Sequence, residues 1–152
     1  MEWLTGMAQN KFLIAGVAAW TTAQVLKTLI HMVIYKKFDV HRLFGDGGMP
    51  SGHSATVTSL AVSSAILYGT ATFEFAISTT LALIVCHDAM GVRQETGKQN
   101  VVLKELMDAF SGEIEWKFTE VQLKEFVGHT PLQVVAGILT GATVAAVVCN
   151  LL

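Results

Sequence analysis

The stretch FLIAGVAAWTTAQVLKTLIHMVIY, residues 12–35, has 24 residues and a single formal charge, at Lys27. A helix of this length rises about 36 Å. The hydrocarbon core of a bilayer is about 30 Å thick, and about 20 apolar residues cross it. The stretch therefore predicts a membrane-crossing helix. Other apolar segments along the chain extend this prediction to the rest of the fold.

Three further apolar segments follow, at residues 54–71, 73–87 and 131–152, and the last has no formal charge. A tight turn is expected near residues 69–72, between the second and third segments. Charged residues make up 14% of the chain, against about 25% in soluble domains. We predict an all-α, polytopic membrane helical bundle with about four transmembrane helices.

The whole chain, residues 1–152, is interpreted as one integral-membrane domain with a polar insertion at about 94–128. The stretches at 100–110 and 119–129, within this region and at its end, place apolar residues at helical spacing. They predict short amphipathic helices at the membrane interface or against the bundle. The net charge of −2 gives no indication of a nucleic-acid partner.

Four spans would place the loops at 36–53 and 88–130 on one face of the membrane. Positively charged loops tend to lie on the cytoplasmic side, so we expect this face to be cytoplasmic. Some of these cations could instead belong to a binding site, and they would then not report on the orientation of the protein in the membrane. The face carries Lys36, Lys37, Arg42, Arg93, Lys98, Lys104, Lys117 and Lys124.

Two polar residues, Gln24 and Lys27, interrupt the first span. A lysine at membrane depth costs about 2.5–3.5 kcal/mol on insertion scales, so such a residue usually faces protein or water and marks function. The alternative is that Lys27 extends its long side chain to the headgroups. We favour the functional interpretation.

Two histidines precede or begin apolar segments on the predicted loop face. His53 lies in GDGGMPSGHSA, residues 45–55, whose glycines leave backbone N–H groups accessible to an anion. Ser54 could cap the helix that follows. His129 comes directly before Thr130, the expected N-cap of the last span. The common placement indicates one site built from both histidines.

The stretch DAMGVRQETGKQ, residues 88–99, follows the third span and contains Asp88, Arg93 and Lys98. Arginine binds phosphate oxygens in a bidentate manner, so this loop could hold an anion. Ordinary surface charge is the alternative. Together with the histidines and Lys27, the loop predicts a phosphate site at the membrane edge.

These motifs resemble the type-2 phosphatidic acid phosphatase superfamily. PSGH at residues 50–53 is similar to its second motif, and His129, Val134, Gly137 and Gly141 match the spacing of its third. Across residues 12–145 the chain looks more like a divergent branch of small bacterial and plastid membrane proteins related to acid phosphatases and vanadium-dependent haloperoxidases. The resemblance implies an integral protein of a bacterial plasma membrane or a plastid membrane.

The resemblance also implies a mechanism: hydrolysis of a lipid or prenyl phosphate monoester through a phosphohistidine, without a metal or other cofactor. His129 would be the nucleophile and His53 the general acid. The residues expected to hold the phosphoryl oxygens are Lys27, Arg42, Arg93, Lys98, Ser51 and Gly52.

The chain departs from the superfamily at Gln133, which replaces an aspartate, and its arginine is displaced to Arg93. Asp88 or Glu125 could supply the missing carboxylate, and we favour Asp88. The alternative is a catalytically weak or inactive phosphate- or lipid-binding membrane protein. A small transporter or assembly subunit is a third interpretation, which would need a homo-oligomer because four spans leave little room for a conduction path.

Overall fold

A computed structural model describes residues 2–36, 48–91, 98–103, 105, 106, 109 and 129–151. Within these ranges all regular structure is helical, which confirms the predicted all-α class. Residues 100–103, which lie in one of the two segments expected to be amphipathic, are helical. The other segment, at 119–129, falls outside the described residues except for His129.

The first predicted span forms helix α2, Lys11–Tyr35. It begins where it does because the Asn10 side chain accepts hydrogen bonds from the backbone N–H groups of Phe12 and Leu13, at 3.0 and 3.2 Å. A short helix that was not predicted, α1 (Glu2–Ala8), precedes it. The length of α2 is therefore determined by a local cap as well as by hydropathy.

The second and third segments form a helical hairpin of α3, Gly52–Tyr68, and α4, Phe73–Met90. Residues 69–72 connect them, as predicted. Gly69 adopts a positive φ of 86°, a conformation that glycine reaches without strain. The last segment forms α6, Pro131–Leu151.

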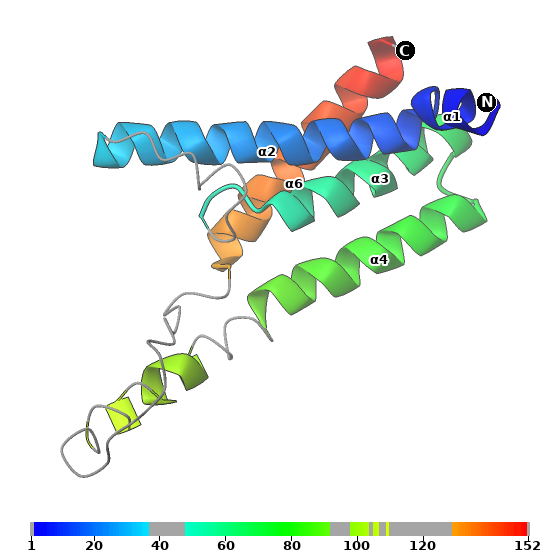
Figure 1. The fold of residues 1–152 in the computed structure, drawn as a ribbon. Coiled ribbons are helices and arrows are strands. Elements are labelled where there is room, and N and C mark those ends of the chain that lie inside the picture. Colours follow the sequence, from blue (N-terminus) through cyan, green and yellow to red (C-terminus); the bar gives the residue numbers. More distant parts are fainter. Residues whose placement is uncertain are drawn as a thin grey trace.

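Helix α3 is the centre of the bundle and packs against α2, α4 and α6 (Figure 1). Its contacts use small residues: Ala55 packs with Ala19 and Ala23 of α2. On α6, Gly141 lies directly against the Ala55 backbone, and Gly137 lies against Ser51. The spacing of these two glycines therefore lets α6 approach α3 closely.

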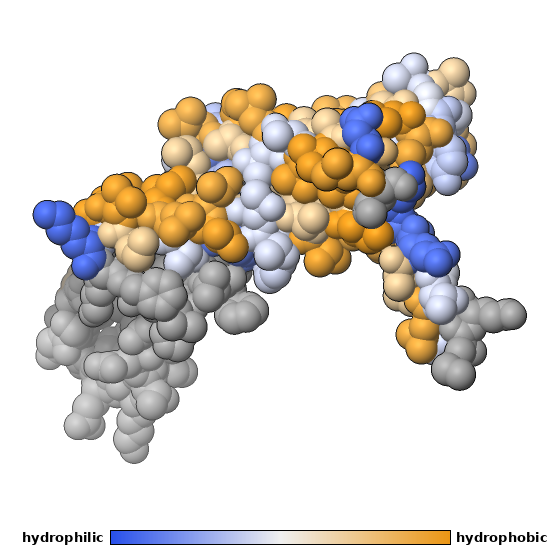
Figure 2. All heavy atoms as spheres, turned by 90° about the horizontal axis from the view of Figure 1, so that it is seen from above, coloured by the Kyte–Doolittle hydropathy of each residue, from blue (hydrophilic) through white to orange (hydrophobic). Residues whose placement is uncertain are grey.

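The outer surface is apolar. Large hydrophobic side chains are exposed along α2, α4 and α6, and such side chains cover much of the face seen in Figure 2. These three helices are long and apolar enough to cross a membrane. Helix α3, with 17 residues, lies among them, so the predicted count of about four membrane helices is close.

The helices alternate in direction, which gathers the predicted functional motifs at one end of the bundle. The last residues of α2 and α4 and the first residues of α3 and α6 lie toward the same end in Figure 1. The opposite end carries the 69–72 turn. The loops that follow α2 and α4 therefore leave the bundle from the same end, as the four-span prediction requires.

Candidate functional site

The two histidines singled out in the sequence face each other. The ring centroids of His53 and His129 are 6.5 Å apart, and the ring planes are inclined by 55°. His53 is the second residue of α3 and is exposed, whereas His129 lies just before α6 and is only 5% exposed. Two histidines from distant parts of the chain thus come together at the end of the bundle.

Two backbone hydrogen bonds hold the elements around this site. The Ser51 N–H donates to the Gln133 carbonyl at 3.0 Å and joins α3 to α6. The His129 N–H donates to the Ala89 carbonyl at 3.1 Å and joins the start of α6 to α4. The positions of both histidines therefore depend on main-chain contacts between helices that are distant in sequence.

Gln133 is a hydrogen-bond partner of the His129 ring. Its Oε1 lies 3.1 Å from His129 Nδ1 and also accepts from the Thr130 N–H at 3.1 Å. The Gln133 N–H in turn donates to Thr130 Oγ1 at 3.4 Å. Thr130 is the N-cap of α6, as predicted, and the two residues form a reciprocal capping box. The pattern Thr-x-x-Gln in the sequence is the signal that could have identified this role.

The N-cap of α3 differs from the one that we expected. Ser51, and not Ser54, is the N-cap of α3, and its Oγ accepts from the Ser54 N–H at 3.3 Å. Ser51 is fully buried, and its amide is engaged with Gln133. Ser51 and Gly52 were both expected to hold phosphoryl oxygens. The Ser51 N–H already donates to Gln133, and a phosphate contact from Gly52 stays a prediction.

Lys27 lies beneath this loop and is only 5% exposed. A β-carbon on Gly48 would be 3.2 Å from Lys27 Cγ, and Gly48 has a positive φ of 84°, so the loop backbone passes directly over the lysine stem. Lys27 is therefore enclosed by protein. The Oε1 of Gln24, on the same buried face of α2, has no hydrogen-bond partner among the described residues.

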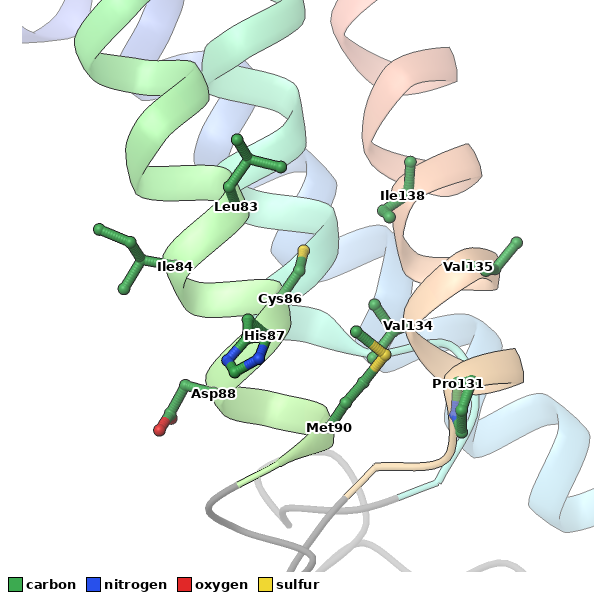
Figure 3. Close-up of a pocket in the computed structure, with 10 residues that line it drawn as sticks. All are labelled: Leu83, Ile84, Cys86, His87, Asp88, Met90, Pro131, Val134, Val135 and Ile138. Carbon is green, nitrogen blue, oxygen red and sulfur yellow. The ribbon is translucent and has the colours of Figure 1, made fainter.

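The remaining predicted site residues are Asp88 and Lys98, which the structure describes, and Arg42 and Arg93. Asp88 is half-buried near the end of α4, and in Figure 3 its carboxylate points away from α6. Lys98 is exposed on the helical segment at 98–103. Arg42 and Arg93 lie outside the described residues. The structure thus brings His53 and His129 together, with Gln133 at the ring nitrogen for which we expected Asp88.

An apolar groove of about 800 Å³ opens between α4 and α6, beside the site. Figure 3 shows Met90 extending toward Val134 across the space between the two helices. Pro131, two residues after His129, lines the groove at the same end as His87 and Asp88. The other lining residues are Leu83, Ile84, Cys86, Val135 and Ile138.

The fold and the placement of these motifs are those of a membrane protein related to type-2 phosphatidic acid phosphatases. The chain belongs to the divergent PAP2 family, whose model matches residues 8–144. It is also similar to YuiD of Bacillus subtilis (strain 168), described as an uncharacterized membrane protein. The two are 37% identical over 150 residues, which cover 93% of this chain and 92% of that relative. No solved structure matches the chain.

Proposed function

We propose that the protein is a membrane phosphatase that hydrolyses a lipid or prenyl phosphate monoester. The observation that carries the proposal is the approach of His53 and His129, at 6.5 Å between ring centroids. Near-attack distances are about 3–3.5 Å, and hydrogen bonds to a leaving oxygen are about 2.6–3.2 Å. Rings at this separation are close enough to contact opposite sides of one phosphoryl group.

In the first half of the reaction, a ring nitrogen of His129 attacks phosphorus. The ester P–O bond breaks, and its electron pair stays on the alkoxide oxygen, which takes a proton from His53. In the second half, water attacks the phosphohistidine while neutral His53 accepts a proton from it. The P–N bond then breaks, inorganic phosphate leaves, and His129 regains its lone pair. Each histidine thus returns to its starting state.

Positive charge near the phosphoryl oxygens is the other requirement, because negative charge on these oxygens must be compensated during transfer. Lys27, buried beneath the Gly48 backbone, is the described cation best suited to this role. Arg42 and Arg93 are proposed to join it.

The groove between α4 and α6 supports a substrate with a hydrocarbon tail. Its lining is almost entirely apolar, and it lies beside the first turn of α6. A substrate with its phosphate at the two histidines could leave its tail in this groove and in the surrounding lipid. We also propose that the site faces the cytoplasm, on the basis of the lysines and arginines in the loops at this end.

The test is phosphate release by the purified protein in detergent micelles, with a phosphatidic acid and a prenyl phosphate as substrates. We expect His129→Ala and His53→Ala to abolish release. His31→Ala is the matched control, because His31 stacks on Tyr35 within α2 and is not part of the site. Release that survives His129→Ala would refute the proposal.

A second candidate is a protein that binds phosphate or lipid without turnover. The observation that favours it is Gln133, a neutral partner for His129 where the superfamily pattern has an aspartate. Lipid phosphate binding by the wild type that survives His129→Ala, with no phosphate release, would select this function.

A further inference from the structure

The atom of Gln133 that faces His129 can be assigned from its other partner. The Thr130 backbone N–H lies 3.1 Å from Gln133 Oε1. A backbone N–H can only donate, and the amide NH₂ group of glutamine also only donates, so the atom at this position must be the carbonyl oxygen. The orientation of the Gln133 side chain is therefore fixed by the cap of α6.

The same oxygen lies 3.1 Å from His129 Nδ1. An amide oxygen carries no hydrogen, so this contact is a hydrogen bond only if Nδ1 bears the proton. In the neutral imidazole the lone pair then resides on Nε2. We infer that Gln133 is a positioning residue that holds His129 in the Nδ1–H tautomer and leaves Nε2 as the nucleophile.

The backbone of Gln133 adds a second positioning role. Its carbonyl accepts from the Ser51 N–H at 3.0 Å, and Ser51 caps the helix whose second residue is His53. One residue thus orients the ring of His129 through its side chain and anchors the start of the His53 helix through its main chain. This arrangement couples the geometry of the two histidines.

Glutamate is the informative replacement, because Thr-x-x-Glu forms the same capping box. A carboxylate would keep the acceptor at Nδ1 and add a negative charge. It would favour the protonated form of His129 and raise its pKa, so the acidic limb of the activity profile should move to higher pH. Leucine has a similar size and offers no acceptor.

The experiment is ¹⁵N NMR of the His129 ring in detergent micelles, at a pH where the ring is neutral. The wild type and Gln133→Glu should both have the proton on Nδ1, whereas Gln133→Leu should shift toward the Nε2–H form. Thr130→Val is the control, because it removes the Oγ1 cap and keeps the backbone N–H, so the tautomer should stay unchanged. If Gln133→Leu does not fold, the wild-type tautomer and the Gln133→Glu pH profile decide.

The catalytic consequence rests on the proposed function and is measured separately. Loss of the correct tautomer in a serine protease triad lowers kcat about 10⁴-fold, so Gln133→Leu should lower kcat about 10²-fold or more. A wild-type Nε2–H ring, or a tautomer unaffected by Gln133→Leu, would overturn the inference. A wild type that has the Nδ1–H ring but releases no phosphate would overturn the proposed function alone.

Discussion

Gly141 of α6 lies so close to Ala55 of α3 that a β-carbon on the glycine would overlap the Ala55 carbonyl. The contact involves backbone on the α3 side, so no side-chain rotation can relieve it. We expect Gly141→Ala to separate the two helices, with a loss of stability of about 1–3 kcal/mol, as for other overpacked sites. Thermal unfolding in detergent micelles measures the loss.

The control for this substitution is Gly6→Ala, because nothing lies within 4 Å of a β-carbon at that position in α1. It should leave the unfolding temperature unchanged or slightly higher, since alanine favours helix over glycine. Equal effects of the two substitutions would show that the α3–α6 contact is not as close as described.

The groove between α4 and α6 predicts a difference between long and short substrates. Ile138→Trp places an indole in the groove and should lower kcat/KM for a long-chain lipid phosphate about tenfold, which corresponds to about 1.4 kcal/mol. Hydrolysis of p-nitrophenyl phosphate, which has no tail, should change little. Leu139→Trp, on the exposed face of α6, is the control and should alter neither substrate. Parallel losses on both substrates would argue against the groove as the tail site.

Lys27 is buried beneath Gly48, and we predict that its ammonium group compensates negative charge on the phosphoryl oxygens. Lys27→Met keeps most of the apolar stem and removes the ammonium group. We expect kcat/KM to fall on the order of 10²-fold or more, in the range found when one donor to a transition-state charge is removed. The control is Lys11→Met, at the first residue of α2 and the far end of that helix from the site. Full activity of Lys27→Met would show that Lys27 has only a structural role.

The proposed orientation predicts the labelling of cysteines placed at the two ends of the bundle. Lys98→Cys and Thr70→Cys both replace exposed residues, one on the motif side and one in the 69–72 turn. A membrane-impermeant maleimide should label Thr70→Cys in intact cells and Lys98→Cys only in inverted vesicles. The wild type, with Cys86 buried and Cys149 half-buried, serves as the blank. The opposite pattern would place the site outside the cytoplasm.

The helices were predictable because hydropathy and local signals act over short stretches of chain. The run at 12–35 forms a helix that differs by one residue at its start, and the turn at 69–72 contains a glycine that adopts a positive φ. The sequence also indicated that His53 and His129 would share one end of the bundle. These features depend on the composition of each segment and on the number of membrane crossings between the histidines. Both can be read from a single sequence.

The details of the site depend on contacts that a linear pattern does not record. We expected Ser54 to cap α3, but the cap is Ser51, three residues earlier. The backbone N–H of Ser51 donates to the Gln133 carbonyl of α6, a contact between distant residues that the sequence does not record. Asp88, the favoured partner, directly precedes Ala89, whose carbonyl accepts from the His129 backbone N–H, yet Gln133 contacts the ring. The capping hydrogen bonds at the start of α6 fix the direction of the Gln133 side chain, because Gln133 is itself part of the cap.

The enclosed position of α3 bears on how the protein is made. A helix of 17 residues with several buried serines gains little from lipid alone, and it finds its partners in α2 before it and in α4 and α6 after it. Since the ribosome delivers α6 after these other helices, the surface of α3 that receives Gly137 and Gly141 stays uncovered until α6 has been synthesised. His129 lies just before α6 in the chain, so the pair of His53 and His129 cannot form before this last helix is being synthesised.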